Sequence, residues 1–192
     1  MPLNWIETAT GQKFDPTNPR LTAYNTRDIA PALSKICRYN GQTKMFYSVA
    51  EHSVHLARYL QKQGHNRFIV RTALMHDASE AYVGDLVVCM KHLLPEFKKM
   101  EERVMECISE TFGLIYPIPE IVHQVDQRIL VDERDFLMSD SGNNWPCDTL
   151  ERLGINIQCW SPPQAQQEFM STYRSTSIMD SLGRQASAVE RP

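Results

Sequence analysis

Residues 73–86 read ALMHDASEAYVGDL, and they set a histidine and an aspartate side by side within an apolar helical pattern. The periodicity predicts one helix over 67–82 with a buried centre, and Gly84 is expected to end it. A charged side chain in such a helix is costly to bury unless it is paired or bound to a metal ion. His76 and Asp77 therefore mark a candidate site, although His-Asp neighbours also occur as simple hydrogen-bonded couples.

Helical signals continue on both sides of this stretch. Ser48 with Glu51 three residues later is typical of a capping box, and Gly113 follows an apolar stripe as a C-terminal stop. We expect helices over 27–38, 48–64, 67–82, 87–94, 95–112, 120–138 and 164–173. Alternating β-branched residues are almost absent after residue 25. The sequence therefore predicts an all-α fold.

The two ends of the chain differ from this helical region. Residues 1–25 suggest an irregular or hairpin-like segment with a turn at Thr10-Gly11, and residues 175–192 are polar enough to predict a disordered tail. We expect one helical domain over 26–174 between these ends, because 192 residues suit a single domain of ordinary size.

Composition excludes several classes of protein. Hydrophobic residues make up 42% and charged residues 22%, which is typical of a globular chain, and a formal charge of −3 disfavours general nucleic-acid binding. No apolar run approaches a membrane span, and the first residues lack the pattern of a secretory signal. Five widely spaced cysteines without a CxxC pair fit a reducing cytosol.

Further histidines and carboxylates lie at positions where they can join His76 and Asp77. His52 belongs to the preceding predicted helix and Asp126 to a later one. Imidazole and carboxylate together suit Zn, Mn, Co, Ni or Fe. Spacing alone leaves rivals open, because His55 follows His52 by three residues, and Asp132 and Glu133 follow Asp126 within two turns.

Three segments resemble one known family. They are VAEHSVHLARYL (49–60), ALMHDASEAYVGDL (73–86) and VDQRILVDERDF (125–136), and together they are similar to HD-domain metal-dependent phosphohydrolases. The stretch CRYNGQTKMFYSVAEHS (37–53) resembles the small nucleotide-hydrolysing branch, which contains 5′-deoxynucleotidases and phage enzymes that act on dATP. The likeness extends from about Phe14 to Tyr173.

The resemblance assigns roles to individual residues. It implies a metal site made of His52, His76, Asp77 and Asp126. A coordinated water in such a site can reach a pKa of about 7. The motif places the first ligand directly after Glu51, and hence favours His52 over His55.

The same resemblance suggests catalytic and substrate-binding groups. Glu80 shares a helix face with His76 and would orient water or carry its proton, and Asp85 would act on the nucleophile or leaving group. Arg38 and Lys91 would bind substrate phosphates. Tyr39 stands where relatives often carry tryptophan, so stacking on a base or sugar is retained, whereas their selectivity does not transfer.

These expectations favour a metal-dependent nucleotide phosphohydrolase, with a dATP-like deoxynucleoside triphosphate preferred to a monophosphate as substrate. The cofactor would be a divalent transition metal (Co, Mn, Zn or Ni), with Mg entering alongside substrate phosphates. Neither a nucleic-acid polymer nor a membrane is expected as a partner, and a homo-oligomer is left open. We expect a cytoplasmic protein of a bacterium or of a phage-infected host. The alternative of another class is a non-catalytic HD module that senses a nucleotide.

Overall fold

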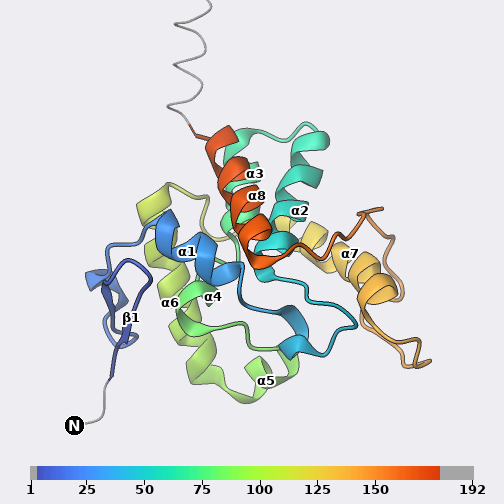
Figure 1. The fold of residues 1–192 in the computed structure, drawn as a ribbon, viewed down its shortest axis with the longest axis horizontal. Coiled ribbons are helices and arrows are strands. Elements are labelled where there is room, and N and C mark those ends of the chain that lie inside the picture. The colour runs from blue at the N-terminus through green and yellow to red at the C-terminus, as the bar shows by residue number, and fades with distance from the viewer. Residues whose placement is uncertain (1–3, 178–192) are drawn as a thin grey trace, which may run out of the picture.

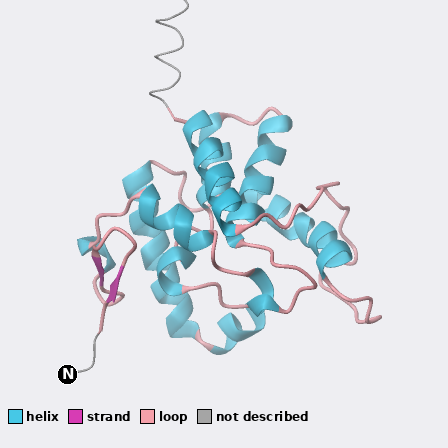
Figure 2. Ribbon diagram, viewed as in Figure 1, coloured by secondary structure: helices cyan, strands magenta, loops and turns pink. Residues whose placement is uncertain are grey.

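The structure, a computed structural model, describes residues 4–177 and consists almost entirely of helices and loops (Figure 2). The predicted all-α fold is confirmed. The elements in chain order are β1 (Ile6–Glu7), β2 (Lys13–Phe14), η1 (Pro19–Leu21), α1 (Thr26–Leu33), η2 (Arg38–Gly41), α2 (Val49–Lys62), α3 (Arg67–Met75), α4 (Glu80–Val83), α5 (Val88–Leu93), α6 (Pro95–Phe112), α7 (Glu120–Leu137) and α8 (Pro162–Ser175), where η marks a 3-10 helix.

The N-terminal segment forms the expected hairpin. Strands β1 and β2 pair antiparallel, with Ile6 opposite Phe14, and they lie beside α1 and α6 (Figure 1). Phe14 is buried against the ring of Tyr82, 5.0 Å away between ring centroids. The backbone N–H and hydroxyl of Thr10 both donate to the carboxylate of Asp28, at 2.8 Å each. These contacts fix the hairpin to α1.

The core centres on α2, which packs against α3 and α8 (Figure 1). Apolar residues of α2 such as Leu56 and Leu60 are fully buried, as are Leu74 of α3, Ile129 of α7 and Phe169 of α8. Each such side chain contributes about 1.5–3 kcal/mol by leaving water. Helix α7 contacts both α2 and α3, which brings its polar side chains to those of the two helices.

The helix expected over 67–82 is broken, and this prediction was wrong in one respect. Helix α3 ends at Met75, residues 76–79 form turns, and α4 begins at Glu80. His76 Nδ1 lies 2.8 Å from the Ala73 carbonyl oxygen, an acceptor that a continuous helix would offer to the N–H of Asp77. The histidine side chain thus competes with the helix backbone at the break.

The first long helix also differs from its prediction. Asn25 caps α1 by accepting from the N–H of Asp28, and the helix spans Thr26–Leu33 rather than the predicted 27–38. The following chain turns back, because the Arg38 N–H donates to the Tyr47 carbonyl and Cys37 forms an isolated antiparallel β-bridge with Ser48. Arg38 consequently lies in the 3-10 turn η2.

The capping box predicted for α2 is only half formed. The Ser48 side chain accepts from the Glu51 N–H at 3.1 Å, as expected. The Glu51 carboxylate turns away and accepts the backbone N–H groups of Gln158, Cys159 and Trp160 at 2.6–2.9 Å. Glu51 thereby ties the loop before α8 to α2.

The C-terminal part of the described chain is a long loop followed by α8. Helix α8 begins at Pro162, two residues before the predicted start, since proline suits the first helical position. The predicted tail over 175–192 lies almost wholly outside the described residues, apart from Ser175, Thr176 and Ser177. Among residues 4–177, no helix has the length and apolar character that spanning a bilayer requires.

Candidate metal centre

Three side chains from three helical segments converge at the centre of the fold. His52 comes from α2, His76 from the end of α3 and Asp126 from α7. Asp126 Oδ1 lies 3.0 Å from His52 Nε2 and 3.8 Å from His76 Nε2. The three ligand atoms lie within 4.8 Å of one another, so this group could hold a metal ion.

The hydrogen bonds of the two imidazoles fix which nitrogen faces the centre. His76 Nδ1 must donate to the Ala73 carbonyl, and His52 Nδ1 donates to the buried carboxylate of Glu133 at 2.6 Å. Each ring therefore turns Nε2 toward Asp126. Both Nε2 atoms are buried, and neither makes a hydrogen bond. Two buried imidazole lone pairs aimed at one point fit a divalent metal ion.

Asp77, the fourth ligand that the resemblance implied, lies at the edge of this group. Its Oδ2 atom is 3.2 Å from His76 Nε2 and 3.8 Å from His52 Nε2. The same oxygen is 3.6 Å from Nη1 of Arg38, so Asp77 also faces a cation. All four sequence-predicted ligands are thus brought together, with Asp77 beside the three-residue group.

Carboxylates dominate the electrostatics of this centre. Burial and Arg38 lower the pKa of His52, but Glu133 and Asp126 outweigh them and raise it to about 9. Burial raises the pKa of Asp126, but the two histidines hold it well below its usual range. Without a metal ion the site attracts protons, and a cation can take their place.

Two of the rival ligands have other partners. His55 Nε2 lies 3.2 Å from Glu51 Oε1, and the His55 ring lies between those of Tyr47 and Trp160. Asp132 accepts the backbone N–H groups of residues 153–155 at 2.8–3.1 Å. Neither side chain belongs to the three-residue group, so the structure favours His52 over His55 and Asp126 over Asp132.

Arg38 and Tyr39 lie next to the centre, on the turn η2. Arg38 Nη2 is 3.3 Å from Glu133 Oε2, and its side chain is only 12% exposed. The Tyr39 hydroxyl also donates to Glu133 Oε2, which leaves only the Tyr39 ring for stacking. Tyr39 and Asn40 adopt positive φ angles of 57° and 53°, which non-glycine residues rarely do. The backbone here is held in an uncommon conformation beside a charged cluster, as is frequent at functional sites.

A cluster of acidic residues that includes Glu80 and Asp85 adjoins the metal centre. Glu80 is 4% exposed and its Oε2 atom is buried without a hydrogen bond. Burial, then the charges of Asp77 and Asp85, raises the pKa of Glu80 well above its usual range. Burial likewise raises the pKa of Asp85. Two carboxyls with raised pKa values therefore lie close to the charges of the metal centre.

Lys91 links this cluster to α6. Its Nζ atom lies 2.8 Å from Glu101 Oε1 and 3.4 Å from Glu80 Oε1. The predicted phosphate-binding cation is therefore already paired with two carboxylates. Burial raises the pKa of Glu101, although Lys91 lowers it.

Sequence reasoning assigned no role to Glu101 and treated Glu133 only as a rival ligand. Glu101 falls on an ordinary amphipathic helix, where nothing distinguishes it from its solvated neighbours. Glu133 directly follows Asp132, and both are buried on α7. The available signal for Glu133 was an acidic residue at a helix position that is buried, where acidic residues are rare unless they are paired.

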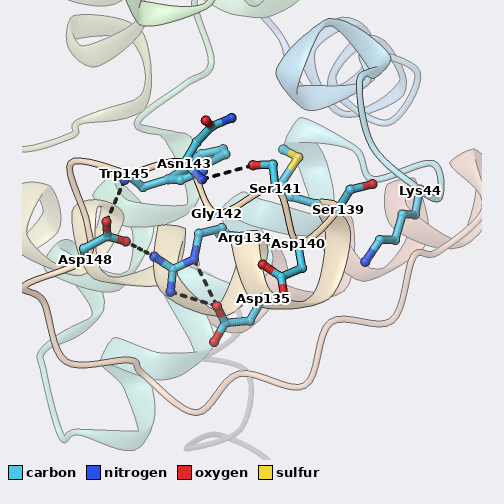
Figure 3. Close-up of a pocket in the computed structure, with 11 residues that line it drawn as sticks. Lys44, Arg134, Asp135, Ser139, Asp140, Ser141, Gly142, Asn143, Trp145 and Asp148 are labelled. Atoms are coloured by element: carbon cyan, nitrogen blue, oxygen red, sulfur yellow. Dashed lines mark hydrogen bonds and ion pairs between the residues drawn. The ribbon is translucent and has the colours of Figure 1, made fainter.

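A surface pocket of about 500 Å³ lies apart from the metal centre, between α7, Lys44 and the loop after residue 138 (Figure 3). Within it Arg134 donates to Asp135 and Asp148, and the Trp145 N–H donates to Asp148 as well. The charge of Arg134 is thus neutralised by its neighbours. The ring of Trp145 contacts that of Tyr39, 6.2 Å away between centroids, so the pocket wall touches η2.

The chain has relatives in two bacteria. No model of a known protein family matches it. It is 35% identical over 181 residues to the uncharacterized protein YfdR of Escherichia coli K12, and this alignment spans 91% of the chain and 97% of YfdR. It is 29% identical over 120 residues to the uncharacterized protein RCAP_rcc00048 of Rhodobacter capsulatus, with 60% of the chain and 61% of that protein aligned. Since the first alignment covers nearly the whole length of both proteins, the chain belongs to the same family as YfdR.

Proposed function

We propose that this protein is a metal-dependent phosphohydrolase of nucleotides with an HD-type metal site. One observation carries the proposal: His52 and His76 both donate from Nδ1 to fixed acceptors, so both turn a buried, unbonded Nε2 atom toward Asp126. An ordinary structural histidine would have its second nitrogen satisfied or exposed. Asp77 lies close enough to act as the fourth ligand.

The residues around the centre suit phosphate-ester hydrolysis. A divalent transition metal, when bound, would polarise a phosphate oxygen and lower the pKa of a coordinated water. Arg38, held between Asp77 and Glu133, presents a fixed cation next to the metal ligands. The guanidinium fork matches the geometry of phosphate oxygens.

Glu80 and Asp85 are suited to the proton transfers. Hydrolysis requires a proton to leave the attacking water and another to reach the departing oxygen. Burial, then the charges of Asp77 and Asp85, raises the pKa of Glu80 well above its usual range, and burial raises that of Asp85, which favours proton exchange by these two carboxyls. Lys91 binds Glu80 and so positions this group from α5.

We propose a deoxynucleoside triphosphate such as dATP as substrate, with Co, Mn, Zn or Ni as the metal ion and Mg entering with the phosphates. A deoxynucleoside monophosphate is the second candidate. It is favoured by the fact that Arg38 and Lys91 are both already paired with carboxylates, since a triphosphate carries more charge to neutralise. Free nucleotides occur in the cytoplasm, which is where we propose that the protein acts.

The test begins with chelator-stripped protein reloaded with Mn²⁺, Co²⁺, Zn²⁺, Ni²⁺ or Mg²⁺ in turn. Each form is incubated with ribo- and deoxynucleoside mono- and triphosphates, and products are resolved chromatographically. We expect a transition metal to restore turnover of a deoxynucleotide, and His76→Ala to remain inactive. The exposed His123→Ala serves as the control and should behave like the wild type.

The outcomes distinguish the alternatives. Release of triphosphate from dATP supports the preferred substrate, and turnover of dAMP with dATP untouched supports the second candidate. Metal binding without turnover of any nucleotide would overturn the proposed phosphohydrolase activity in favour of a nucleotide-sensing module. Full activity after exhaustive chelation would overturn the metal site.

A further inference from the structure

We propose that Glu133 is a positioning residue that holds the metal ligand His52 with one carboxylate oxygen and the phosphate-binding Arg38 with the other. This inference rests on the proposed function, because it concerns the metal site and substrate cation named there. It assigns to a residue outside the ligand set the coupling between metal affinity and substrate binding.

The contacts of Glu133 divide cleanly between its two oxygens. Oε1 accepts from His52 Nδ1 at 2.6 Å and from the Tyr47 hydroxyl at 3.0 Å. Oε2 accepts from the Tyr39 hydroxyl and from Arg38 Nη2, the latter at 3.3 Å. The side chain is fully buried, so no water competes for these positions.

The Oε1 contacts govern the metal side. A carboxylate accepts but does not donate, so His52 must carry its proton on Nδ1 and keep Nε2 free for a metal ion. Carboxylate partners of this kind fix the tautomer and orientation of a ligating imidazole and make it a stronger ligand. Tyr47, itself fully buried, holds the same oxygen in place from the other side.

The Oε2 contacts govern the substrate side. Arg38 lies on a turn between α1 and α2, where the strained residues Tyr39 and Asn40 provide little helical support. The bond to Glu133 on α7, together with the ion pair to Asp77, therefore sets the position of the guanidinium. Removing this bond would loosen Arg38 without touching a metal ligand.

Glu133→Gln separates the contacts on the metal side from those on the substrate side. The amide oxygen can still accept from His52, but its NH₂ group then faces Arg38, which has donors only. Glu133→Ala removes the contacts of both oxygens. Asp132→Asn is the matched control, because this neighbouring carboxylate on α7 is also buried and, among residues 4–177, its hydrogen bonds come from the backbone of residues 153–155.

The experiment compares the full-length wild type, E133Q, E133A and D132N. Zn²⁺ and Co²⁺ affinities are measured by chelator competition, and KM and kcat are measured with the substrate found above. NMR of the Zn²⁺-loaded protein records the Nδ1 proton of His52. Chemical denaturation reports stability for all four.

We expect E133A to lose about 10–100-fold in metal affinity and to lose the protected Nδ1 proton. E133Q should keep metal affinity within a few-fold of wild type while KM rises more than kcat falls. D132N should lose stability with metal affinity and the Nδ1 signal unchanged. If E133A does not fold, Glu133→Asp replaces it, since a carboxylate one methylene shorter cannot keep all four contacts.

Two failures are distinguishable. If the wild type binds no metal ion, the proposed function fails. Suppose instead that the wild type binds metal, that E133A or its replacement binds metal equally well, and that the KM of E133Q equals that of D132N. Glu133 is then merely structural, and this inference is overturned while the proposed function stands.

Discussion

Glu51 offers the sharpest test of how the structure is held together. Its carboxylate is fully buried and accepts N–H groups from Gln158, Cys159 and Trp160, together with a contact to His55 at 3.2 Å. Glu51→Ala would leave three backbone donors without their acceptor. The loop before α8 would then lose its attachment to α2.

The magnitude follows from how far water can reach each donor. A buried donor left without a partner costs about 1–3 kcal/mol. The Trp160 N–H is enclosed and should cost the upper part of that range, whereas Gln158 is exposed and Cys159 half-buried, so water can partly replace their acceptor. The sum is about 3–5 kcal/mol, a large share of the ~5–15 kcal/mol by which domains are stable.

Urea denaturation followed by tryptophan fluorescence and circular dichroism measures this loss. Glu51→Gln should lose somewhat less, because one amide oxygen remains as an acceptor. The exposed Glu96→Gln, whose side chain is 82% accessible, should stay within about 0.5 kcal/mol of wild type. A loss below about 1 kcal/mol for Glu51→Ala would refute the reasoning, because the three bonds would then carry no net free energy.

Three further predictions concern the site and the hairpin. His76→Ala should empty the protein of metal, measured by elemental analysis, whereas His55→Ala should retain it; the reverse result would mean that the ligands are misassigned. Glu80→Ala should keep metal and nucleotide binding but lose about 10²–10⁴-fold in turnover, and unaltered turnover would reduce Glu80 to a structural charge. Burial raises the pKa of Asp28, but hydrogen bonds from Thr10 and Asn25 lower it below its ordinary value. Its contribution to stability is therefore present above the ordinary pKa and is lost as pH falls through the folded one, and an NMR titration of Asp28 with an unshifted midpoint would contradict this.

The helices could be predicted from the sequence because their signals are local. The stripe of α6, its start at Pro95 and its end at Gly113 all depend on residues within a few turns, and the structure has them as expected. The hairpin around Thr10-Gly11 is local in the same way. The break after Met75 escaped prediction because it involves the side chain of His76 bonding its own helix, which periodicity does not register.

The candidate site was only partly predictable, because it depends on contacts between residues that lie far apart in the sequence. The spacing of His52, His76 and Asp126, read with a family resemblance, named the three residues that the fold brings together. The resemblance favoured His52 over His55, but spacing alone could not choose between them, since both are buried on one helix and differ in what α7 and the loop before α8 place against them.

The sequence by itself determined which segments are helical, where a helix such as α6 starts and stops, and which residue types could meet in a polar centre. Only the tertiary structure decided the partners of the buried carboxylates. Glu133 reaches His52 across 81 positions and Glu51 reaches Trp160 across 109. The physical reason is that a buried carboxylate takes whichever donors the packing of distant helices supplies, and local propensity holds no information about those donors.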